Sequence, residues 1–274
     1  MALGNSINAS QTGFQSLNAT TGAWNGRSLT PGAGISITNQ DGTGGNPVIT
    51  STGMTPDPFG TVYLIDDFLF GENPVGNMNW LETGGSSTTP LNGTSTHPGI
   101  YRVGTNSSGG TIIMGGGTTA GDPCPIIIGG GTITADFLVN ISATNNGTMC
   151  IGLGAGSTTG NIEPADGVYF LYNSATNSGN WVGKTANAST RSSANSAVAV
   201  VGNTWVRLTI VINAAGTSAS FFVNNVQIAN SPLATNLPTA AIAPRVSNTG
   251  GTAGGGADLS IDLFVLTIAL TASR

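Results

Sequence analysis

From residue 61 onward the sequence consists of short β-prone runs separated by turn residues, and this pattern limits the fold more than any other feature. Valine, isoleucine, threonine and aromatic residues fill the runs, and pairs such as Gly-Gly, Asn-Gly, Asn-Asn or Ala-Gly separate nearly all of them. These two groups of residues favour strands and tight turns, respectively. No stretch shows a helical period longer than two turns. The pattern predicts an all-β domain, an antiparallel sandwich or barrel.

The expected strands can be located by their β-branched and aromatic residues. They lie at residues 62–70, 100–103, 112–114, 125–128, 132–142, 149–153, 167–172, 181–184, 197–201, 205–213, 218–223, 226–229, 241–246 and 259–269.

Two hairpins are the clearest local predictions in this region. In residues 205–213 every second side chain is apolar, and we expect these side chains to form the core face: Val206, Leu208, Ile210 and Ile212. The strand at 218–223 follows after a connector that contains Gly216. A second hairpin turns at Asn224 and Asn225, because asparagine tolerates the positive φ that a two-residue turn requires.

Residues 29–51 form a different kind of segment near the N-terminus. Two β-prone runs, 35–38 and 48–50, flank a connector rich in glycine, asparagine and aspartate. We expect a hairpin, but one with few aliphatic side chains. An isolated hairpin is marginally stable in water, so this one should become stable by packing on other copies or on a partner.

Pro56 and Pro58 divide the chain into two parts. They remove two backbone donors and prevent a continuing helix, so residues 56–60 are predicted to be a linker. Residues 1–55 would then be a docking or oligomerisation module, and residues 61–274 a jelly-roll-like sandwich. The hypothesis for the module is that its larger apolar residues make contacts between subunits: Phe14, Leu17, Trp24, Ile35 and Ile37.

Residues 32–49 match the pattern GxGISITNxDGxxGNPxI, which resembles short repeats in the tail fibres and other virion appendages of tailed bacteriophages. The resemblance implies a virion structural protein. It would be made in the host cytoplasm and would join the particle by assembly. Its expected partners are other virion proteins and further copies of itself, with a homotrimer favoured.

A second resemblance lies in the sandwich region. Residues 205–208 (Trp-Val-Arg-Leu) and 221–226 (Phe-Phe-Val-Asn-Asn-Val) resemble central strands of concanavalin A-like and laminin G-like jelly rolls. Asn225 stands where that family usually has glycine. Looser similarities at residues 66–68, 166–170 and 258–264 extend the resemblance over 60–274. They are closer to C-terminal domains of phage structural proteins than to true lectins.

The scarcity of charge excludes several classes of protein. Charged residues make up 7% of the chain, against about 25% in an average soluble protein, which is typical of extracellular β-proteins, adhesins and virion components. The seven basic residues are scattered and the net charge is −5, so we expect no nucleic-acid partner. The longest apolar run, 261–270, is too short to span a membrane. The first ten residues lack the features of a signal peptide.

The sequence offers no convincing catalytic arrangement. Glycoside hydrolysis uses two carboxyl groups about 5–9.5 Å apart, whereas Asp258 and Asp262 would lie roughly 13 Å apart along one strand. Nucleophilic catalysis would have to use His97, the single histidine, but no G-x-S-x-G motif is present. We therefore expect His97 to be a solvated loop residue, and the protein not to be an enzyme.

Ligand sites can be proposed only from residue type. Calcium, which takes about six to eight oxygen ligands, could use Asp122, Glu163 and Asp166, and we expect no other cofactor. A host-surface glycan could stack on exposed aromatic rings, with candidates Trp80, Tyr101, Tyr172 and Trp181. The alternative for Tyr172 and Trp181 is burial in a hairpin core. Cys124 and Cys150 are expected to be buried thiols rather than a disulfide or zinc ligands.

These observations predict a non-catalytic virion surface protein with a structural and adhesive role. It would assemble through its N-terminal module and display its sandwich for contacts with a host surface or a shell. The first alternative is a capsid decoration (cement) protein that stabilises the head. A free lectin or glycan hydrolase is a further alternative.

Overall fold

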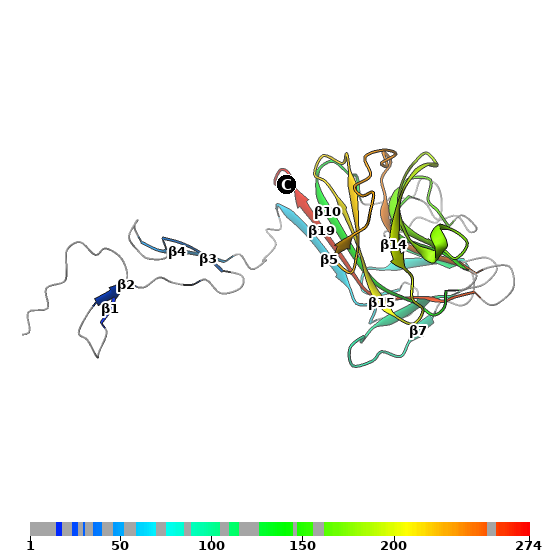
Figure 1. Ribbon diagram of the computed structural model, residues 1–274, viewed down its shortest axis with the longest axis horizontal. Coiled ribbons are helices and arrows are strands. Elements are labelled where there is room, and N and C mark those ends of the chain that lie inside the picture. Colours follow the sequence, from blue (N-terminus) through cyan, green and yellow to red (C-terminus); the bar gives the residue numbers. More distant parts are fainter. Residues whose placement is uncertain are drawn as a thin grey trace, which may run out of the picture. The chain divides into compact units, whose positions relative to one another are not determined.

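The computed structural model describes residues 15–17, 24–26, 30, 35–39, 46–51, 59–69, 75–84, 89–104, 110–114, 126–144, 147–155, 162–250 and 256–274. The chain divides into two compact units, Met1–Pro56 and Asp57–Arg274. Apart from one short 3-10 turn, η1 (Asn177–Gly179), the regular structure in the described residues is all strand, so the predicted all-β class is confirmed (Figure 1). None of the helical structure described there could cross a membrane.

The described residues of the N-terminal unit form two antiparallel hairpins. Strand β1 (Gln15–Leu17) pairs with β2 (Trp24–Gly26), which places Leu17 opposite Trp24. Strand β3 (Ile35–Thr38) pairs with β4 (Val48–Ser51), which places Ile37 opposite Ile49. The predicted hairpin between residues 35 and 51 is therefore confirmed.

The second unit is a sandwich of two antiparallel sheets (Figure 1). The eight-stranded sheet runs in the order β17 (Val226–Gln227), β16 (Ala219–Val223), β15 (Trp205–Ile212), β10 (Gly131–Ile141), β19 (Leu259–Leu270), β8 (Ile100–Val103) and β7 (Thr89–Leu91), and β5 (Thr61–Asp66) also pairs with β19. The seven-stranded sheet runs in the order β14 (Thr190–Ala199), β13 (Asn180–Asn187), β12 (Gly167–Asn173), β11 (Gly147–Gly154), β18 (Ala243–Gly250), β9 (Gly110–Met114) and β6 (Trp80–Gly84).

The core lies between the two sheets and is built from alternate residues of each strand. In β10 every second residue is buried, the period of a strand with one face inside. The predicted core face of β15 is confirmed, because Leu208, Ile210 and Ile212 are fully buried and Val206 packs against them. The predicted tight turn is confirmed too, since Asn224 and Asn225 have φ of 50° and 66°.

A β-bulge in β19 changes which residues face the core. Leu138 of β10 lies opposite Leu263, but the next residue, Val139, lies opposite Ile261, so Asp262 has no counterpart. The extra residue shifts the alternation by one position. Ile261 and Phe264 therefore both point inward, although an uninterrupted strand would place them on opposite faces.

Some boundaries differ from the sequence prediction. Strands β6 and β7 and the polar first half of β14 were not expected. Strand β6 contains a glutamate and a glycine, β7 a proline, and the first half of β14 is rich in serine, so tertiary pairing rather than local propensity favours a strand there. Of the predicted strand at 125–128, residues 126–128 are described, and among them only Ile126 makes a β-bridge, with Ile242. In the predicted linker, Gly60 and Phe59 accept backbone hydrogen bonds from Leu270 and Arg274, so both belong to the sandwich.

Candidate functional site

A row of polar side chains crosses the face of the seven-stranded sheet that points away from the core. Tyr169 of β12 lies opposite Lys184 of β13 on one side and Gly152 of β11 on the other. Gly152 in turn lies opposite Arg245 of β18. Because alternate residues of a strand point to opposite faces, the core residue Phe170 confirms that its neighbour Tyr169 faces outward.

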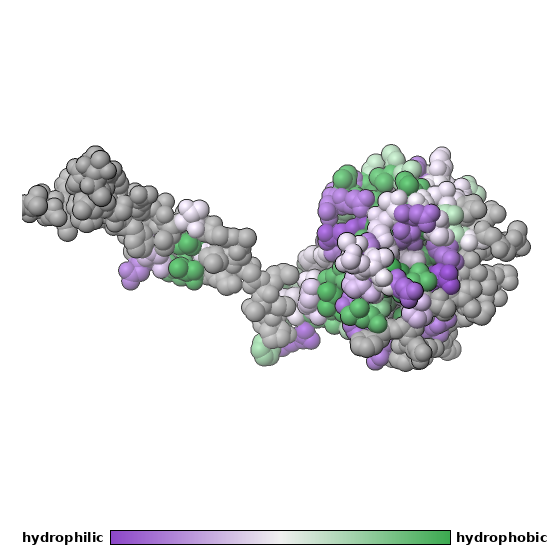
Figure 2. All heavy atoms as spheres, turned by 90° about the horizontal axis from the view of Figure 1, so that it is seen from below, coloured by the Kyte–Doolittle hydropathy of each residue, from purple (hydrophilic) through white to green (hydrophobic). Residues whose placement is uncertain are grey.

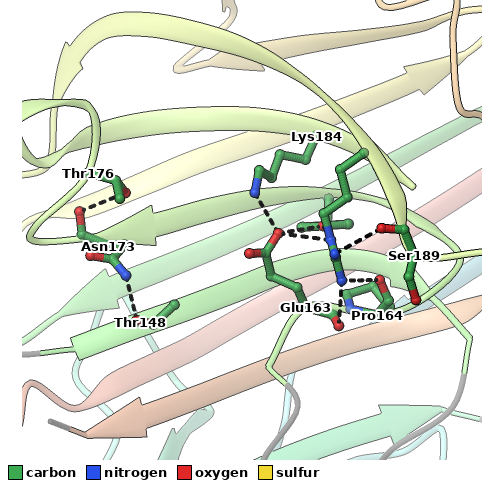
Figure 3. Close-up of polar contacts among 9 residues, drawn as sticks. Thr148, Glu163, Pro164, Asn173, Thr176, Lys184 and Ser189 are labelled. Atoms are coloured by element: carbon green, nitrogen blue, oxygen red, sulfur yellow. Dashed lines mark hydrogen bonds and ion pairs between the residues drawn. The ribbon is translucent and has the colours of Figure 1, made fainter. Parts of the chain in front are cut away.

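Glu163 is the centre of this polar row. Its Oε2 atom accepts hydrogen bonds from Nζ of Lys184 at 2.6 Å and from the hydroxyl of Tyr169 at 2.8 Å. Nε of Arg191 lies 3.3 Å from the same oxygen. Figure 3 shows the amino group of Lys184, on β13, pointing at the Glu163 carboxylate, which comes from the segment before β12. One carboxylate oxygen thus joins residues of three different segments.

Arg191 extends the network to the backbone. Its guanidinium donates to the carbonyls of Glu163, Pro164 and Ser189 at 3.1–3.4 Å. The amide of Ser189 donates in return to the carbonyl of Ala165 at 2.8 Å (Figure 3 labels Ser189 and Pro164). These bonds fasten residues 163–165 to the turn between β13 and β14 and to the start of β14. We call the four side chains Glu163, Tyr169, Lys184 and Arg191 the Glu163 clip.

The clip also explains an unusual backbone conformation. Ala188 and Ser189 form the turn between β13 and β14 with φ of 46° and 68°, a region that residues other than glycine seldom adopt. Besides the bond from Ser189, the amide of Ala188 donates to Oδ1 of Asp166 at 3.2 Å. The surrounding hydrogen bonds therefore hold a turn that the two residues would not adopt by themselves.

Burial and charge set the protonation states around the clip. Burial acts to raise the pKa of Glu163, but hydrogen bonds from Lys184 and Tyr169 and the charges of Lys184 and Arg191 outweigh it, so the pKa lies below its usual value. Burial, reinforced by nearby negative groups, raises the pKa of Tyr169. Burial also raises the pKa of the neighbouring Cys150 thiol to about 12. At neutral pH the carboxylate is ionised, and the phenol and the thiol are neutral.

This chemistry suits a structural clip better than a catalytic centre. A general acid must carry a proton near the working pH, and the Glu163 carboxylate does not. Its described hydrogen-bond and ion-pair partners are two cations and a phenol rather than the second carboxyl group that glycoside hydrolysis requires.

Residues 96–262, more than half of the chain, match the family described as "SO2946-like, C-terminal domain". The chain belongs to the SO2946-like C-terminal domain family. No curated protein sequence matches it significantly.

Two solved structures share the sandwich of this SO2946-like domain. The crystal structure of SO2946, a protein of unknown function from Shewanella oneidensis MR-1, is 16% identical with a TM-score of 0.57, over 78% of this chain and 89% of that one. The carbohydrate recognition domain of Emp47p is 11% identical with a TM-score of 0.50, over 78% of this chain and 97% of that one. At these identities the likeness shows the fold alone, a jelly-roll-like sandwich, as the sequence predicted.

The structure contradicts the predicted exposed aromatic platform in the SO2946-like domain. The four rings proposed to stack on a glycan, Trp80, Tyr101, Tyr172 and Trp181, are each at most 2% exposed. The alternative, burial of Tyr172 and Trp181 in the core, is confirmed. The hydroxyl of Tyr172 donates a hydrogen bond to the carbonyl of Thr144, and the hydroxyl of Tyr101 donates one to the carboxylate of Glu82. Both hydroxyls therefore have partners within the protein. Residue type alone could not tell a buried ring from an exposed one. Tyrosine and tryptophan combine an apolar ring with one polar group, so they occur both in cores and at exposed surfaces.

The calcium candidates do not form a ligand cluster in the described residues. No group of three histidine, cysteine or acidic residues that could hold a metal occurs there. Asp122 lies outside the described residues. Glu163 belongs to the segment that the clip fastens and Asp166 directly follows that segment, but Oε2 of Glu163 is already bound to Lys184 and Arg191.

His97 is not the solvated loop residue that the sequence predicted. Its Nδ1 lies 2.7 Å from Oδ2 of Asp262, and the two side chains are 20% and 7% exposed. Its ring stacks on Trp205, with centroids 4.4 Å apart and planes 20° apart. The bulge explains the contact, because Asp262 is the extra residue of β19. An orienting carboxylate is what a catalytic histidine would need, but no serine or cysteine is hydrogen-bonded to His97 in the described residues.

The remaining predicted residues are only partly described. Cys150 is a buried free thiol, as expected, and Cys124 lies outside the described residues. Phe14 also lies outside them. Leu17, Trp24, Ile35 and Ile37 lie in the two hairpins of the N-terminal unit, and their contacts between subunits stay a prediction.

Proposed function

We propose that this protein is a non-catalytic surface protein of a bacteriophage virion. Its N-terminal unit would assemble copies of the chain, for which we favour a trimer, on other virion proteins. Its SO2946-like sandwich would provide the surface for contacts with a host glycan or a shell. Cytoplasmic synthesis followed by incorporation into the particle suits such a protein.

The observation that carries the proposal is the uncovered apolar surface of the hairpin β3–β4. Ile37 lies opposite Ile49, and Ile49 is 63% exposed. Val48, on the other face, is 56% exposed. Green hydrophobic residues are visible at the surface of the N-terminal unit in Figure 2. A two-stranded hairpin with exposed aliphatic side chains gains stability when a partner covers them, which supports an assembly role.

Two further observations support a non-catalytic sandwich. The best-organised polar cluster, the Glu163 clip, uses its carboxylate to bind cations of the same chain. The protein also shares its fold with Emp47p, whose domain is named for carbohydrate recognition. A glycan contact in this chain would have to use side chains other than the four buried aromatic residues.

The mass of the full chain in solution tests the assembly role. Sedimentation velocity at micromolar concentration should give an oligomer. Ile49→Asp should convert it to a monomer, because a charge would be placed on the apolar face. Asn46→Asp is the matched control, since Asn46 is exposed just before β4 and lies outside the paired residues of the hairpin, and it should keep the oligomer. A full chain that is monomeric, or an Ile49→Asp oligomer of unchanged mass, would contradict the proposal.

Copy number separates the two virion roles. A decoration protein repeats with the shell lattice and is present in many copies per particle, whereas a tail-fibre protein is present in few. Quantitative mass spectrometry of particles that carry this protein, calibrated against the major shell protein, gives the ratio directly.

A further inference from the structure

A groove of about 250 Å³ lies at one end of the sandwich. Six aliphatic side chains line it, namely Val62, Ile126, Ile127, Ile133, Ile268 and Leu270, and Arg274 is the single charged residue of its lining. Figure 1 shows the start of β5 and the end of β19 side by side at this end of the sandwich. Apolar walls with so little charge favour an apolar occupant.

The rim of the groove exposes two large hydrophobic side chains. Ile127 is 74% exposed and Phe59 is 63% exposed, which are high values for residues of this type. Phe59 is fixed beside the groove because its carbonyl accepts a hydrogen bond from the amide of Arg274 at 2.9 Å. The amide of Thr271 likewise donates to Gly130, which also lines the groove. The rim is therefore an organised apolar surface held by backbone hydrogen bonds.

The position of this rim along the chain points to its occupant. Phe59 lies eight residues after Ser51, the last residue of the hairpin that is proposed to assemble, a reach of at most about 29 Å. When N-terminal units assemble, the chain therefore delivers the rims of several sandwiches to the same neighbourhood. Tethering of this kind gives an effective concentration in the roughly millimolar range, at which a weak apolar contact becomes populated.

We propose that the rim of this groove, formed by Phe59, Ile127 and the groove lining, is a second contact surface between copies of the chain. In this contact the exposed Ile127 or Phe59 of one copy enters the groove of the next copy, a head-to-tail arrangement that closes into a ring in a trimer. The inference rests on the proposed function, since it needs the N-terminal unit to assemble. One or two inserted side chains bury at most roughly a few hundred Å², against roughly 1,600 Å² in a standard stable interface, so the contact depends on the tether.

Hydroxyl-radical footprinting with mass spectrometry tests the inference on the full chain. In the assembled protein, oxidation of Phe59 and Ile127 should be several-fold lower than in the monomeric Ile49→Asp variant, which keeps both units. Val226 is 65% exposed on the hairpin β16–β17 and serves as an internal control that should be oxidised equally in both. Ile127→Asp should keep the oligomer mass but restore the oxidation of Phe59, and Val226→Asp should change neither.

The outcomes separate the two proposals. An oligomer in which Phe59 and Ile127 are oxidised as fast as in Ile49→Asp overturns this inference and leaves the proposed function standing. Protection that persists in the Ile49→Asp monomer would mean that the same chain covers the groove, which also overturns the contact between copies. A monomeric full chain overturns the proposed function and this inference with it.

Discussion

The indole Nε1 of Trp80 donates a 2.9 Å hydrogen bond to Oδ2 of Asp66 in the interior of the sandwich. Trp80 begins β6 of the seven-stranded sheet and Asp66 ends β5 of the eight-stranded sheet, so the bond joins the two layers. The carboxylate is fully buried and also accepts the amides of Phe68, Asn77 and Met78 at 2.8–3.1 Å. Four N–H donors thus replace the water that the buried charge has lost.

Asp66→Asn should destabilise the sandwich by about 3 kcal/mol, because an amide offers one acceptor oxygen and brings two donors into a pocket of donors. Urea unfolding of the full chain, followed by tryptophan fluorescence, measures this. Asp67→Asn is the matched control, since Asp67 accepts one exposed side-chain bond from Asn77, and it should change the free energy of unfolding by less than about 0.5 kcal/mol. Equal effects of the two variants would contradict the role of Asp66.

The Glu163 clip should lose its stabilising effect in acid. Because the pKa of Glu163 is lower in the folded state than its ordinary value of 4.5, the folded state favours the ionised form. The clip therefore stabilises the fold fully at pH values above the pKa that Glu163 has in the unfolded chain. This stabilisation is lost as the pH falls through the lower pKa that Glu163 has in the folded protein. At pH 7, Glu163→Gln should cost about 1–2 kcal/mol, since Lys184 would stay half-buried without its anion.

Urea unfolding at a series of pH values from 7 to 3 checks this sign. The difference between the natural chain and Glu163→Gln should shrink as the pH falls below about 4.5. Asp258→Asn provides a comparison, because the pair of Asp258 with Arg102 has a longer N–O distance of 3.4 Å and about a third of each side chain exposed, and such pairs contribute little. A difference that is constant over the whole pH range would show that the Glu163 charge is not responsible.

Lys184 should resist amine-reactive reagents in the folded protein. It is the single lysine of the chain, its side chain is 15% exposed, and its amino group is bound to Glu163. Acetylation by an N-hydroxysuccinimide ester should modify Lys184 at least tenfold more slowly than the same residue in urea. Glu163→Gln should accelerate the native reaction, because the amino group is no longer held by the carboxylate and can reach the reagent more freely. Peptide mass spectrometry reads out the site, and fast labelling of native Lys184 would contradict the clip geometry.

Cys150 should be unreactive toward thiol reagents at pH 8. A pKa raised to about 12 leaves roughly a thousandth of the thiolate of a cysteine with an unperturbed pKa near 9, and the thiolate is the reactive form. Iodoacetamide labelling followed by peptide mapping separates Cys150 from Cys124. Labelling of Cys150 at the rate of a free peptide thiol, in protein shown to be folded, would contradict the burial.

The fold was predictable from the sequence where short-range patterns decide it. The alternation in residues 205–213 located a core face, and the pair Asn224–Asn225 located a turn, because both follow from local backbone geometry. The burial of Trp80 was not predictable, because it depends on a hydrogen bond to Asp66, which lies in the other sheet. Nothing in the local sequence around either residue indicates that the two meet. The polar β14 was missed for the same reason, since its pairing with β13 overrides weak local propensity.

The contact of His97 with Asp262 is the clearest case of a site that local patterns could not locate, because 165 residues separate the partners. In β19 the buried positions change from odd to even numbers between Ile261 and Phe264, as a bulge requires, but Leu263 and Val265 are apolar as well, so the sequence alone did not reveal the change. The contact matters because it fastens the loop before β8 to the outside of the eight-stranded sheet.

His97→Ala should therefore destabilise the sandwich by about 1–2 kcal/mol, through loss of a partly buried hydrogen bond and of the stack on Trp205. His97→Phe keeps a ring on Trp205 but leaves Asp262 without its donor, and Asp262→Ala removes the acceptor. If the hydrogen bond dominates, His97→Phe should cost about as much as His97→Ala, and the double variant His97→Ala with Asp262→Ala should cost less than the sum of the single variants. Urea unfolding measures all four chains. Strict additivity would show that the two side chains are not coupled and that the histidine stabilises the loop by its ring alone.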